Sequence, residues 1–323
     1  MNDNKILDIL TRTSEYVSGQ ALAQQLGVSR QAVWKEIQAL RTRGYAIESV
    51  TNRGYRLSAM PNYLNAPAVK AALTAKIIGC ELEVFDSVGS TNDYLKARGS
   101  AGCKSGAVAA AREQVSGKGR LGRVWQSRRD ENVMFSVLLR PQIAPSEVGG
   151  ITPLAGLAVC KALRRFTGLD CRIKWPNDII VGRKKLVGIL TEMSAEFDAV
   201  EYIVTGIGVN VDTAAFPGEI ADKATSIFLE TGRHVDKNKL LACLLDRLER
   251  EFVGNELSLT PAAREEYAAL CATLGRTVGF TRGGVPLSGL AAGIAENGAL
   301  EVMLPDGSIC EVNSGEVTAQ GIY

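Results

Sequence analysis

Histidine is almost absent from this sequence, and its scarcity narrows the possible chemistry. His234 is the one histidine among 323 residues, which leaves no room for a multi-histidine metal site or for Ser-His-Asp catalysis. It follows Thr-Gly-Arg just before a helical pattern, so we expect a solvent-exposed loop histidine there.

Paired cysteines and long apolar runs are absent too. The seven cysteines are scattered and never occur as Cys-x-x-Cys, which argues against a disulfide framework or a zinc site and for reduced thiols in a cytoplasm. No apolar run is long enough to span a bilayer, and the first residues have no signal-peptide pattern. We therefore expect a cytoplasmic protein without a membrane partner, and its length allows two or three domains.

Charge is small overall but unevenly placed. The net charge is +2, yet residues 1–60 carry eight Lys or Arg against five Asp or Glu, and the remainder is close to neutral. A small basic module on a neutral body indicates a nucleic-acid partner.

The basic module has the pattern of a helix-turn-helix. Ser18 and Gly27 can cap and end one helix, and a second helix buries Val33, Ile37 and Leu40 at helical spacing. The residues expected to meet DNA on this second helix are Ser29, Arg30, Gln31, Trp34 and Lys35.

A hairpin follows the second helix, with Arg53 at its tip for phosphate or minor-groove contact. The whole stretch resembles the winged helix-turn-helix of bacterial repressors. The alternative is a helical protein-interaction module, but cap, apolar stripe, polar face and hairpin together favour DNA binding.

A loop at residues 114–125 interleaves glycines with cations, as Gln-Val-Ser-Gly-Lys-Gly-Arg-Leu-Gly-Arg-Val-Trp. Glycine uncovers backbone N–H groups, and Lys and Arg add donors for phosphate and carboxylate. It is not a P-loop, because Arg123 and Val124 stand where Lys and Ser or Thr are required. The pattern favours an anion-binding loop over a merely solvated basic one.

Short apolar runs with few helices between them predict an α+β fold with a mixed or antiparallel sheet. After a Leu-rich helix from about Asp236 to Leu257, Gly/Val alternation and two turns, Asn297-Gly298 and Asp306-Gly307, indicate a small antiparallel barrel. The stretch from Pro61 to Pro67 has no apolar period and is expected to be a linker or boundary.

Five motifs occur in a fixed order and carry a family resemblance. They are Ser-Thr-Asn at 90–92, Gln-x-x-Gly-x-Gly-Arg-x-Gly-Arg-x-Trp at 114–125, Lys-Trp-Pro-Asn-Asp at 174–178, Lys-Leu-x-Gly-Ile-Leu at 185–190 and Gly-x-Gly-x-Asn at 206–210. The chain resembles biotin protein ligases of the bifunctional type that also repress the biotin operon. Where family members often have Arg, this loop has Lys118, which keeps the charge but not the bidentate fork.

The resemblance implies three domains. These are a winged helix-turn-helix over 1–62, a catalytic domain over 66–272 with a central mixed sheet like that of class II synthetases and biotin–lipoate ligases, and an SH3-like barrel over 273–323.

The resemblance also implies a reaction. Biotin attacks the α-phosphate of ATP to give biotinoyl-5′-AMP, and a lysine of the biotin carboxyl carrier protein then attacks this adenylate. Lys185 and Arg120 are the expected catalytic residues. The expected biotin contacts are Ser90, Thr91, Asn92, Gln114, Lys118, Gly119, Arg120, Lys185 and Gly188. The expected ATP or adenylate contacts are Gly117, Lys118, Arg120, Arg123, Trp125, Lys174, Asn177, Asp178 and Asn210.

Mg²⁺ would accompany the phosphates, with Asp178 as its candidate ligand. The adenylate-loaded protein would dimerise on the operator of biotin synthesis genes. Two alternatives stay open: a lipoate-type ligase with the same adenylation chemistry, and a non-enzymatic repressor that senses a small acid.

Overall fold

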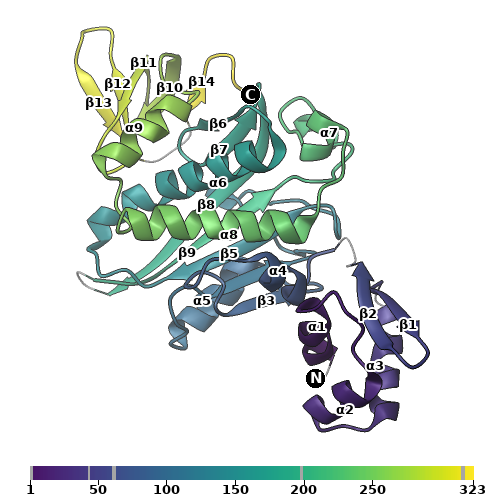
Figure 1. Cartoon of the computed structure of the whole chain (residues 1–323). Helices are drawn as coiled ribbons and strands as arrows, with labels where there is room; N and C mark the ends of the chain where they lie inside the picture. The colour runs from purple at the N-terminus through teal and green to yellow at the C-terminus, as the bar shows by residue number, and fades with distance from the viewer. Residues whose placement is uncertain (1–2, 43, 60–62, 197–198, 314–316) are drawn as a thin grey trace.

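The computed structural model describes residues 3–42, 44–59, 63–196, 199–313 and 317–323. Figure 1 shows a small N-terminal body beside one edge of a large sheet-and-helix body, with a C-terminal sheet on the far side. Helix α1 of the small body lies against α4 of the large one.

The N-terminal body consists of three helices and a hairpin, and its elements are α1 (Asp3–Thr11), α2 (Gly19–Leu26), α3 (Arg30–Thr42), β1 (Ala46–Val50) and β2 (Gly54–Ala59). Ser18 Oγ accepts from Ala21 N (3.1 Å), and Gly27 ends α2 in the left-handed conformation at φ 66°. Ser29 Oγ accepts from Ala32 N (3.1 Å) at the start of α3. The predicted caps and hairpin are therefore confirmed.

A seven-stranded mixed sheet forms the centre of the large body, in the order β3-β4-β5-β9-β8-β7-β6. The β3–β4 pair is parallel and the others are antiparallel. Its strands are β3 (Leu82–Phe85), β4 (Val108–Ala111), β5 (Val133–Leu139), β6 (Cys171–Lys174), β7 (Asp178–Val181), β8 (Lys184–Glu196) and β9 (Ala199–Val209). The predicted α+β class is thus confirmed.

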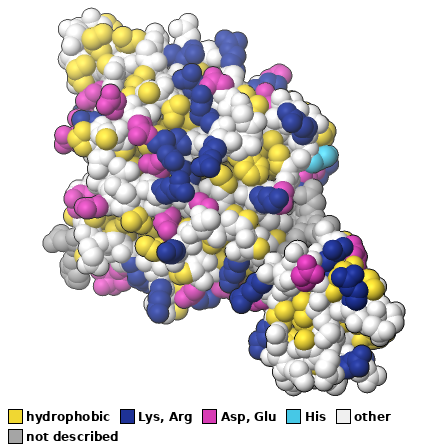
Figure 2. Space-filling view, viewed as in Figure 1, with side chains coloured by type: hydrophobic (Ala, Val, Ile, Leu, Met, Phe, Trp, Pro, Cys, Tyr) yellow, Lys and Arg dark blue, Asp and Glu magenta, His cyan; other side chains and the backbone are white. Residues whose placement is uncertain are grey.

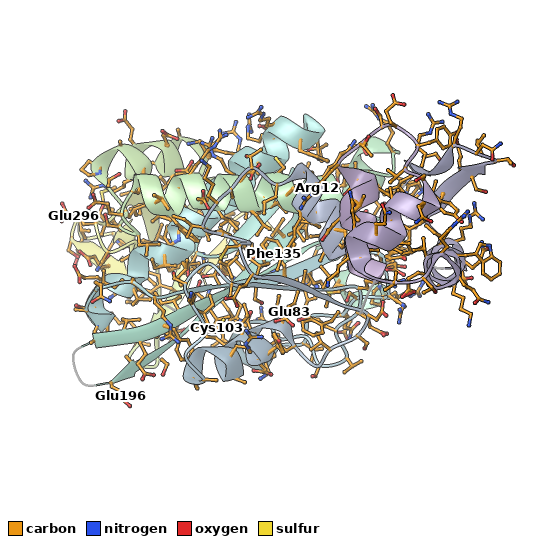
Figure 3. All side chains as sticks on the ribbon, turned by 60° about the horizontal axis from the view of Figure 1, so that its bottom comes forward. Arg12, Glu83, Cys103, Phe135, Glu196 and Glu296 are labelled. Atoms are coloured by element: carbon orange, nitrogen blue, oxygen red, sulfur yellow. The ribbon has the colours of Figure 1, made fainter. Side chains whose placement is uncertain are left out.

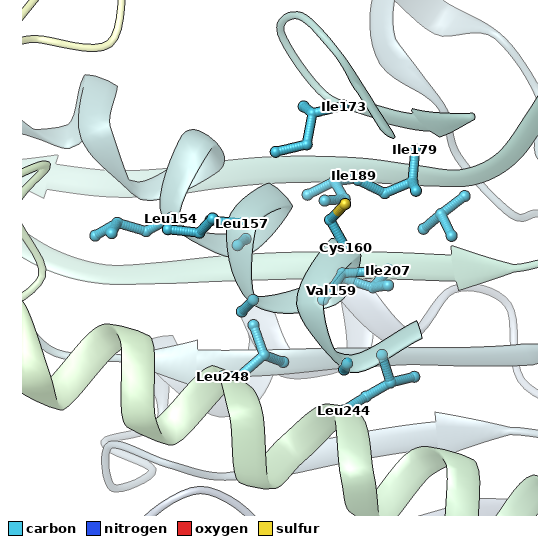
Figure 4. Close-up of a cluster of buried hydrophobic side chains, with 14 of the residues drawn as sticks. Leu154, Leu157, Val159, Cys160, Ile173, Ile179, Ile189, Ile207, Leu244 and Leu248 are labelled. Atoms are coloured by element: carbon cyan, nitrogen blue, oxygen red, sulfur yellow. The ribbon is translucent and has the colours of Figure 1, made fainter. Parts of the chain in front are cut away.

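Two long helices, α6 (Ile151–Thr167) and α8 (Lys237–Gly254), lie over one face of this sheet. Figure 4 shows Leu157 and Cys160 of α6 between Ile189 and Ile207 of the sheet and Leu244 of α8. All of these side chains are buried. Burial also raises the pKa of the Cys160 thiol to about 12, so this cysteine is a core residue.

The remaining helices and 3-10 turns of the large body connect or cover the sheet. They are α4 (Ala66–Ala72), α5 (Thr91–Ser100), α7 (Ile227–Thr231) and α9 (Pro261–Leu270), with 3-10 turns at Arg120–Gly122, Pro145–Gly150 and Gly218–Ile220. Helix α5 packs Leu95 against Leu138 and Val204, on the face of the sheet opposite α6.

The alternation of side chains along β8 and β9 separates core from site. Ile189 and Ile207 belong to the core beneath α6, so Gly188, Gly206 and Gly208 face the other way. Gly188 and Gly208 are direct cross-strand partners. The face opposite α6 therefore has a strip without side chains.

The C-terminal sheet is antiparallel, with the order β13-β12-β11-β10-β14. Its strands are β10 (Thr277–Arg282), β11 (Val285–Ile294), β12 (Leu300–Met303), β13 (Ile309–Val312) and β14 (Thr318–Ala319). Asn297-Gly298 and Asp306-Gly307 turn the chain between strands, as predicted. Trp175 Nε1 donates to Gly298 O (3.0 Å), which fastens this sheet to the large body.

Two sequence expectations need correction. The stretch from Pro61 to Pro67 is not a linker throughout, because Leu64 belongs to the main core and Pro67 lies in the first turn of α4. Pro61 and Asn62 lie outside the described residues. The Leu-rich helix ends at Gly254 and not at Leu257, where the chain turns through a positive φ of 58°.

Candidate active site

A small cavity lies over the glycine strip of β8 and β9, with a volume of about 60 Å³. Its lining joins segments far apart in the sequence: Ser90, Thr91, Asn92, Gln114, Lys118, Gly119, Arg120, Trp125, Phe135, Asn177, Lys185, Gly188, Ile189, Leu190, Gly206, Ile207 and Gly208. Figure 3 labels Phe135, a lining residue from strand β5 of the central sheet.

The indole of Trp125 covers the glycine strip. A Cβ on Gly208 would lie 2.6 Å from Trp125 Cε2, and a Cβ on Gly188 would lie 2.9 Å from Trp125 Cζ3. Neither position could hold a side chain unless the indole moved. The Trp125 indole can therefore pack against the sheet because residues 188 and 208 have no side chains.

The basic loop is folded back on itself as a narrow turn. Trp125 N donates to Gly117 O (2.9 Å), and Gly119 N donates to Arg123 O (2.7 Å). A Cβ on Gly117 would lie 2.6 Å from Trp125 O, so the close approach requires glycine. Leu121 (φ 56°) and Gly122 (φ 74°) reverse the chain at the tip.

Lys118 of this loop pairs with the helix behind it. Its Nζ lies 2.7 Å from Asp93 Oδ2, in the first turn of α5. Burial alone would raise the pKa of Asp93, but hydrogen bonds from Lys118 and Lys96 outweigh it and hold the pKa below its usual value.

A buried chain of hydrogen bonds organises the polar end of the cavity. Gln114 Oε1 accepts from Thr91 N (2.8 Å), and Ser136 Oγ donates to Asn92 Oδ1 (2.6 Å) and lies 2.7 Å from Thr91 Oγ1. Asn92 Nδ2 donates to Glu192 Oε2 (2.7 Å). These contacts fix donors and acceptors in a closed space, as recognition of a small polar group requires.

Charged groups gather at the other end. Lys185 Nζ lies 2.6 Å from Asp178 Oδ1, and Tyr323 donates its hydroxyl to Asp178 Oδ2. Arg120 Nη1 donates to Asn177 Oδ1 (2.9 Å), and burial lowers the pKa of Arg120. Burial lowers the pKa of Lys174 to about 8, although the nearby Asp178 opposes this shift. Three cations beside one carboxylate suit an anionic ligand.

A magnesium ion would find one carboxylate here. No group of three or more His, Cys, Asp or Glu in the described ranges could hold a metal ion. Magnesium is often held by one or two carboxylates together with substrate phosphates and water. Asp178 fits that mode and not an all-protein cage, and its two oxygens now face Lys185 and Tyr323.

Three parts of the chain match models of known protein families. The model of the Biotin/lipoate A/B protein ligase family matches residues 84–210, that of an HTH domain matches residues 2–56, and that of the Biotin protein ligase C terminal domain matches residues 273–318. The bifunctional ligase/repressor BirA of Bacillus subtilis (strain 168) is 35% identical over 294 residues, 89% of each chain. The chain belongs to the bifunctional ligase/repressor family.

Other members of this family match nearly end to end. BirA of Escherichia coli (strain K12) is 30% identical over 321 residues, 98% of each chain. The solved biotin protein ligase from Aquifex aeolicus in complex with biotin and ATP is 28% identical with a TM-score of 0.63, and the match covers 74% of this chain and 98% of that one. The protein is therefore a ligase with an N-terminal helix-turn-helix domain, which confirms the resemblance seen in the motifs.

The structure brings most of the expected ligase residues together at the cavity. Those lining it are Ser90, Thr91, Asn92, Gln114, Lys118, Gly119, Arg120, Trp125, Asn177, Lys185 and Gly188. Gly117 is outside the lining and accepts from Trp125 N within the loop, and Asp178 and Lys174, also outside the lining, lie near Lys185.

Asn210 is one of the expected adenylate ligands that do not line the cavity. It is buried and absent from the cavity lining, and its Nδ2 donates to Thr225 O (3.1 Å) while its N donates to Leu186 O (3.0 Å). In this structure its amide joins β9 to the segment before α7. Arg123 is also absent from the lining, although its charge lies close enough to lower the pKa of Lys174.

Sequence reasoning missed three residues of the site. Ser136 could have been found from the sequence, because it is the one polar residue in the apolar run Val133–Leu139. The sequence gives no comparable indication for Glu192 and Tyr323, because their partners Asn92 and Asp178 lie far away in sequence.

The residues of α3 that we expect to contact DNA include several that are exposed to solvent. The Trp34 side chain is 53% exposed, and Arg30 and Lys35 are exposed. Figure 2 shows Lys and Arg side chains on this body. Arg53 lies over the Tyr16 ring (4.7 Å to the centroid), so the hairpin tip is braced against the stretch between α1 and α2.

Of the helices in the described ranges, none is both long and apolar enough to cross a membrane.

Proposed function

We propose that this ligase activates biotin with ATP and transfers it to a lysine of the biotin carboxyl carrier protein. The observation that carries the proposal is the position of Lys185. Its ammonium lies beside the glycine strip, 5.8 Å from the Trp125 ring centroid and 2.6 Å from Asp178 Oδ1, and the residue lines the same cavity as the polar network. A carboxylate and a phosphate can meet only where fixed positive charge offsets their repulsion.

The reaction is balanced in two steps. A biotin carboxylate oxygen attacks the α-phosphorus of ATP, and the bond to the β-phosphate breaks to release pyrophosphate. The amine of the acceptor lysine then attacks the acyl carbon, AMP leaves, and the amine gives up a proton. Lys185 and Arg120 would stabilise the charge that develops on carboxylate and α-phosphate. Bound Mg²⁺ would neutralise phosphate charge, with Asp178 as its protein ligand.

The polar end of the cavity favours biotin over lipoate. The ureido ring of biotin offers both N–H donors and a carbonyl acceptor, which match the hydrogen-bonding groups of Thr91, Asn92 and Gln114. A dithiolane ring offers neither and would make no hydrogen bonds to this polar lining. The matching family model includes both biotin and lipoate ligases, and this arrangement supports biotin as the substrate.

The basic loop would act as a lid over the adenylate. Arg120 and Lys118 already line the cavity, and Trp125 anchors one end of the loop above the glycine strip. Closure over the mixed anhydride would exclude water, which competes with the acceptor lysine.

The N-terminal body would make the ligase a repressor of biotin synthesis genes. We propose that it is a winged helix-turn-helix, with α3 in the major groove and the β1–β2 hairpin as wing, supported by the exposed Arg30 and Lys35. Biotinoyl-5′-AMP would be the corepressor that favours a homodimer on paired half-sites. The bounds 1–62, 66–272 and 273–323, with an SH3-like last domain, belong to the same proposal.

Pyrophosphate release tests the enzymatic part. Wild-type protein with ATP and Mg²⁺ should release pyrophosphate with biotin and far less with lipoate. Lys185→Ala should lower the rate with biotin at least about a hundredfold, as loss of an electrostatic contact to the transition state does. Lys184→Ala removes the neighbouring cation, whose Nζ lies 3.4 Å from Ala221 O, and should leave the rate unchanged. Near wild-type release by Lys185→Ala would contradict its role.

A further inference from the structure

Tyr323 lies among the charged residues of the ligase site, although it belongs to the segment after β14. The backbone of this segment is tied down at three points. Arg276 Nη1 donates to Gln320 O (3.0 Å), Arg183 Nε donates to Gly321 O (2.8 Å), and Tyr323 N donates to Arg183 O (3.3 Å). The tyrosine is therefore held against the turn between β7 and β8, the two strands that carry Asp178 and Lys185.

The Tyr323 side chain contacts two charged residues at once. Its hydroxyl donates to Asp178 Oδ2, and Lys174 Nζ lies 3.5 Å from its ring centroid. Lys174 Nζ also lies 3.4 Å from Tyr323 O. The ring and carbonyl thus give a buried ammonium the electron-rich partners that it needs.

Asp178 stands near two lysines and pairs with one. Its Oδ1 lies 2.6 Å from Lys185 Nζ, whereas Lys174 Nζ lies 3.5 Å from the Tyr323 ring centroid and forms no ion pair with Asp178 among the described residues. The hydroxyl of Tyr323 occupies Oδ2 and leaves Oδ1 to Lys185. We infer that Tyr323 is a positioning residue, which holds Lys174 off Asp178 and so keeps the carboxylate turned toward Lys185.

This inference rests on the proposed function and adds a residue to it. In the proposed function the carboxylate and both lysines would meet the phosphates and their metal, whereas the ureido ring of biotin would meet the polar network of Thr91, Asn92 and Gln114. Loss of the tyrosine contacts should therefore weaken the handling of ATP and leave biotin binding unchanged.

Tyr323→Phe tests the hydroxyl with the ring kept in place. We expect the KM for ATP in pyrophosphate release to rise about tenfold, the loss expected for one hydrogen bond to a charged group. The Kd of α,β-methylene-ATP, measured by calorimetry with Mg²⁺ and saturating biotin, should rise by a similar factor. The Kd of biotin alone should not change. Tyr323→Ala, which also removes the ring from Lys174, should have at least as large an effect.

Tyr267→Phe is the matched control. The Tyr267 hydroxyl is buried and has no hydrogen-bond partner among the described residues, so its removal should change neither constant. Thermal melting of each variant checks that it folds. If wild type releases no pyrophosphate with biotin, the proposed function fails; if wild type is active but Tyr323→Phe keeps or lowers the KM and Kd for the nucleotide, the positioning role of Tyr323 is wrong.

Discussion

Trp125 and Gly208 are in direct contact: a Cβ on Gly208 would come within 2.6 Å of Trp125 Cε2. The indole therefore occupies space that every residue other than glycine would fill. Because Trp125 N is also bonded to Gly117 O, this contact connects the basic loop to the floor of the cavity.

Gly208→Ala should displace the indole and weaken ligand binding. Overpacking by one methyl group costs about 1–3 kcal/mol, so we expect the Kd of biotin to rise about tenfold or more and the fluorescence of Trp125 to change. Gly218→Ala is the matched control, because a Cβ there meets no atom within 4 Å. Biotin calorimetry on both variants measures the effect, and an unchanged Kd for Gly208→Ala would refute the contact's importance.

Ser136→Ala should loosen the polar end of the site. The Ser136 side chain is fully buried, and its loss leaves Asn92 Oδ1 without that donor, whereas Thr91 Oγ1 keeps its hydrogen bond to Gln114 Oε1 (3.0 Å). A buried group left without its partner costs about 1–3 kcal/mol, so the melting temperature should fall by several degrees and biotin should bind more weakly. Ser194→Ala removes an exposed hydrogen bond to Glu201 and should do neither. Equal melting of the two variants would contradict this account.

The Lys118–Asp93 pair should hold the basic loop in a pH-dependent way. The pKa of Asp93 lies below its usual value of about 4, so the contact is present above the usual pKa and is lost as the pH falls through the lowered one. Hydrogen exchange of residues 117–125 should be faster in Asp93→Asn at neutral pH.

The low-pH arm completes this test. Wild-type exchange, corrected for its intrinsic pH dependence, should approach that of Asp93→Asn as Asp93 protonates. Asp306→Asn removes a remote carboxylate whose pKa is also lowered, by Ser308, and should leave the loop unaffected. A loop equally protected in Asp93→Asn and wild type would show that the pair does not hold it.

Arg30→Ala with Lys35→Ala should weaken binding to a promoter fragment of the biotin synthesis genes. Loss of two phosphate contacts should lower the slope of log affinity against log salt by about 2. Lys239→Ala removes an exposed cation from α8 of the large body and should not change the slope. Gel shifts at several salt concentrations measure this slope. Equal slopes for the double variant and wild type would argue against a DNA-binding face on α3.

Local patterns explain why so much of this structure could be predicted. The caps Ser18 and Ser29, the turn at Gly298 and the loop glycine Gly117 each act through neighbours in sequence, so their residue types were enough. Most residues of the motifs line one cavity, and the motifs at 174–178, 185–190 and 206–210 each begin or end a strand.

Long-range contacts explain what the sequence could not predict. Tyr323 reaches Asp178 only because the C-terminal sheet packs on the large body, and nothing near Tyr323 in sequence announces this. Asn210 follows the glycine-rich strand β9, where we expected it to contact the adenylate. In the structure its side-chain amide donates to Thr225 O, in the segment before α7. Such outcomes depend on how distant elements pack.

Formation of the adenylate is the central claim, and mass spectrometry tests it most directly. The protein is incubated with biotin, ATP and Mg²⁺, freed of small molecules, and measured before and after addition of a biotin carboxyl carrier domain. We predict that it retains a compound with the mass of biotin plus AMP less one water. The carrier should then gain the mass of biotin less one water, while AMP is released. Bound biotin with unconsumed ATP and an unmodified carrier would contradict the account and favour a non-enzymatic sensor.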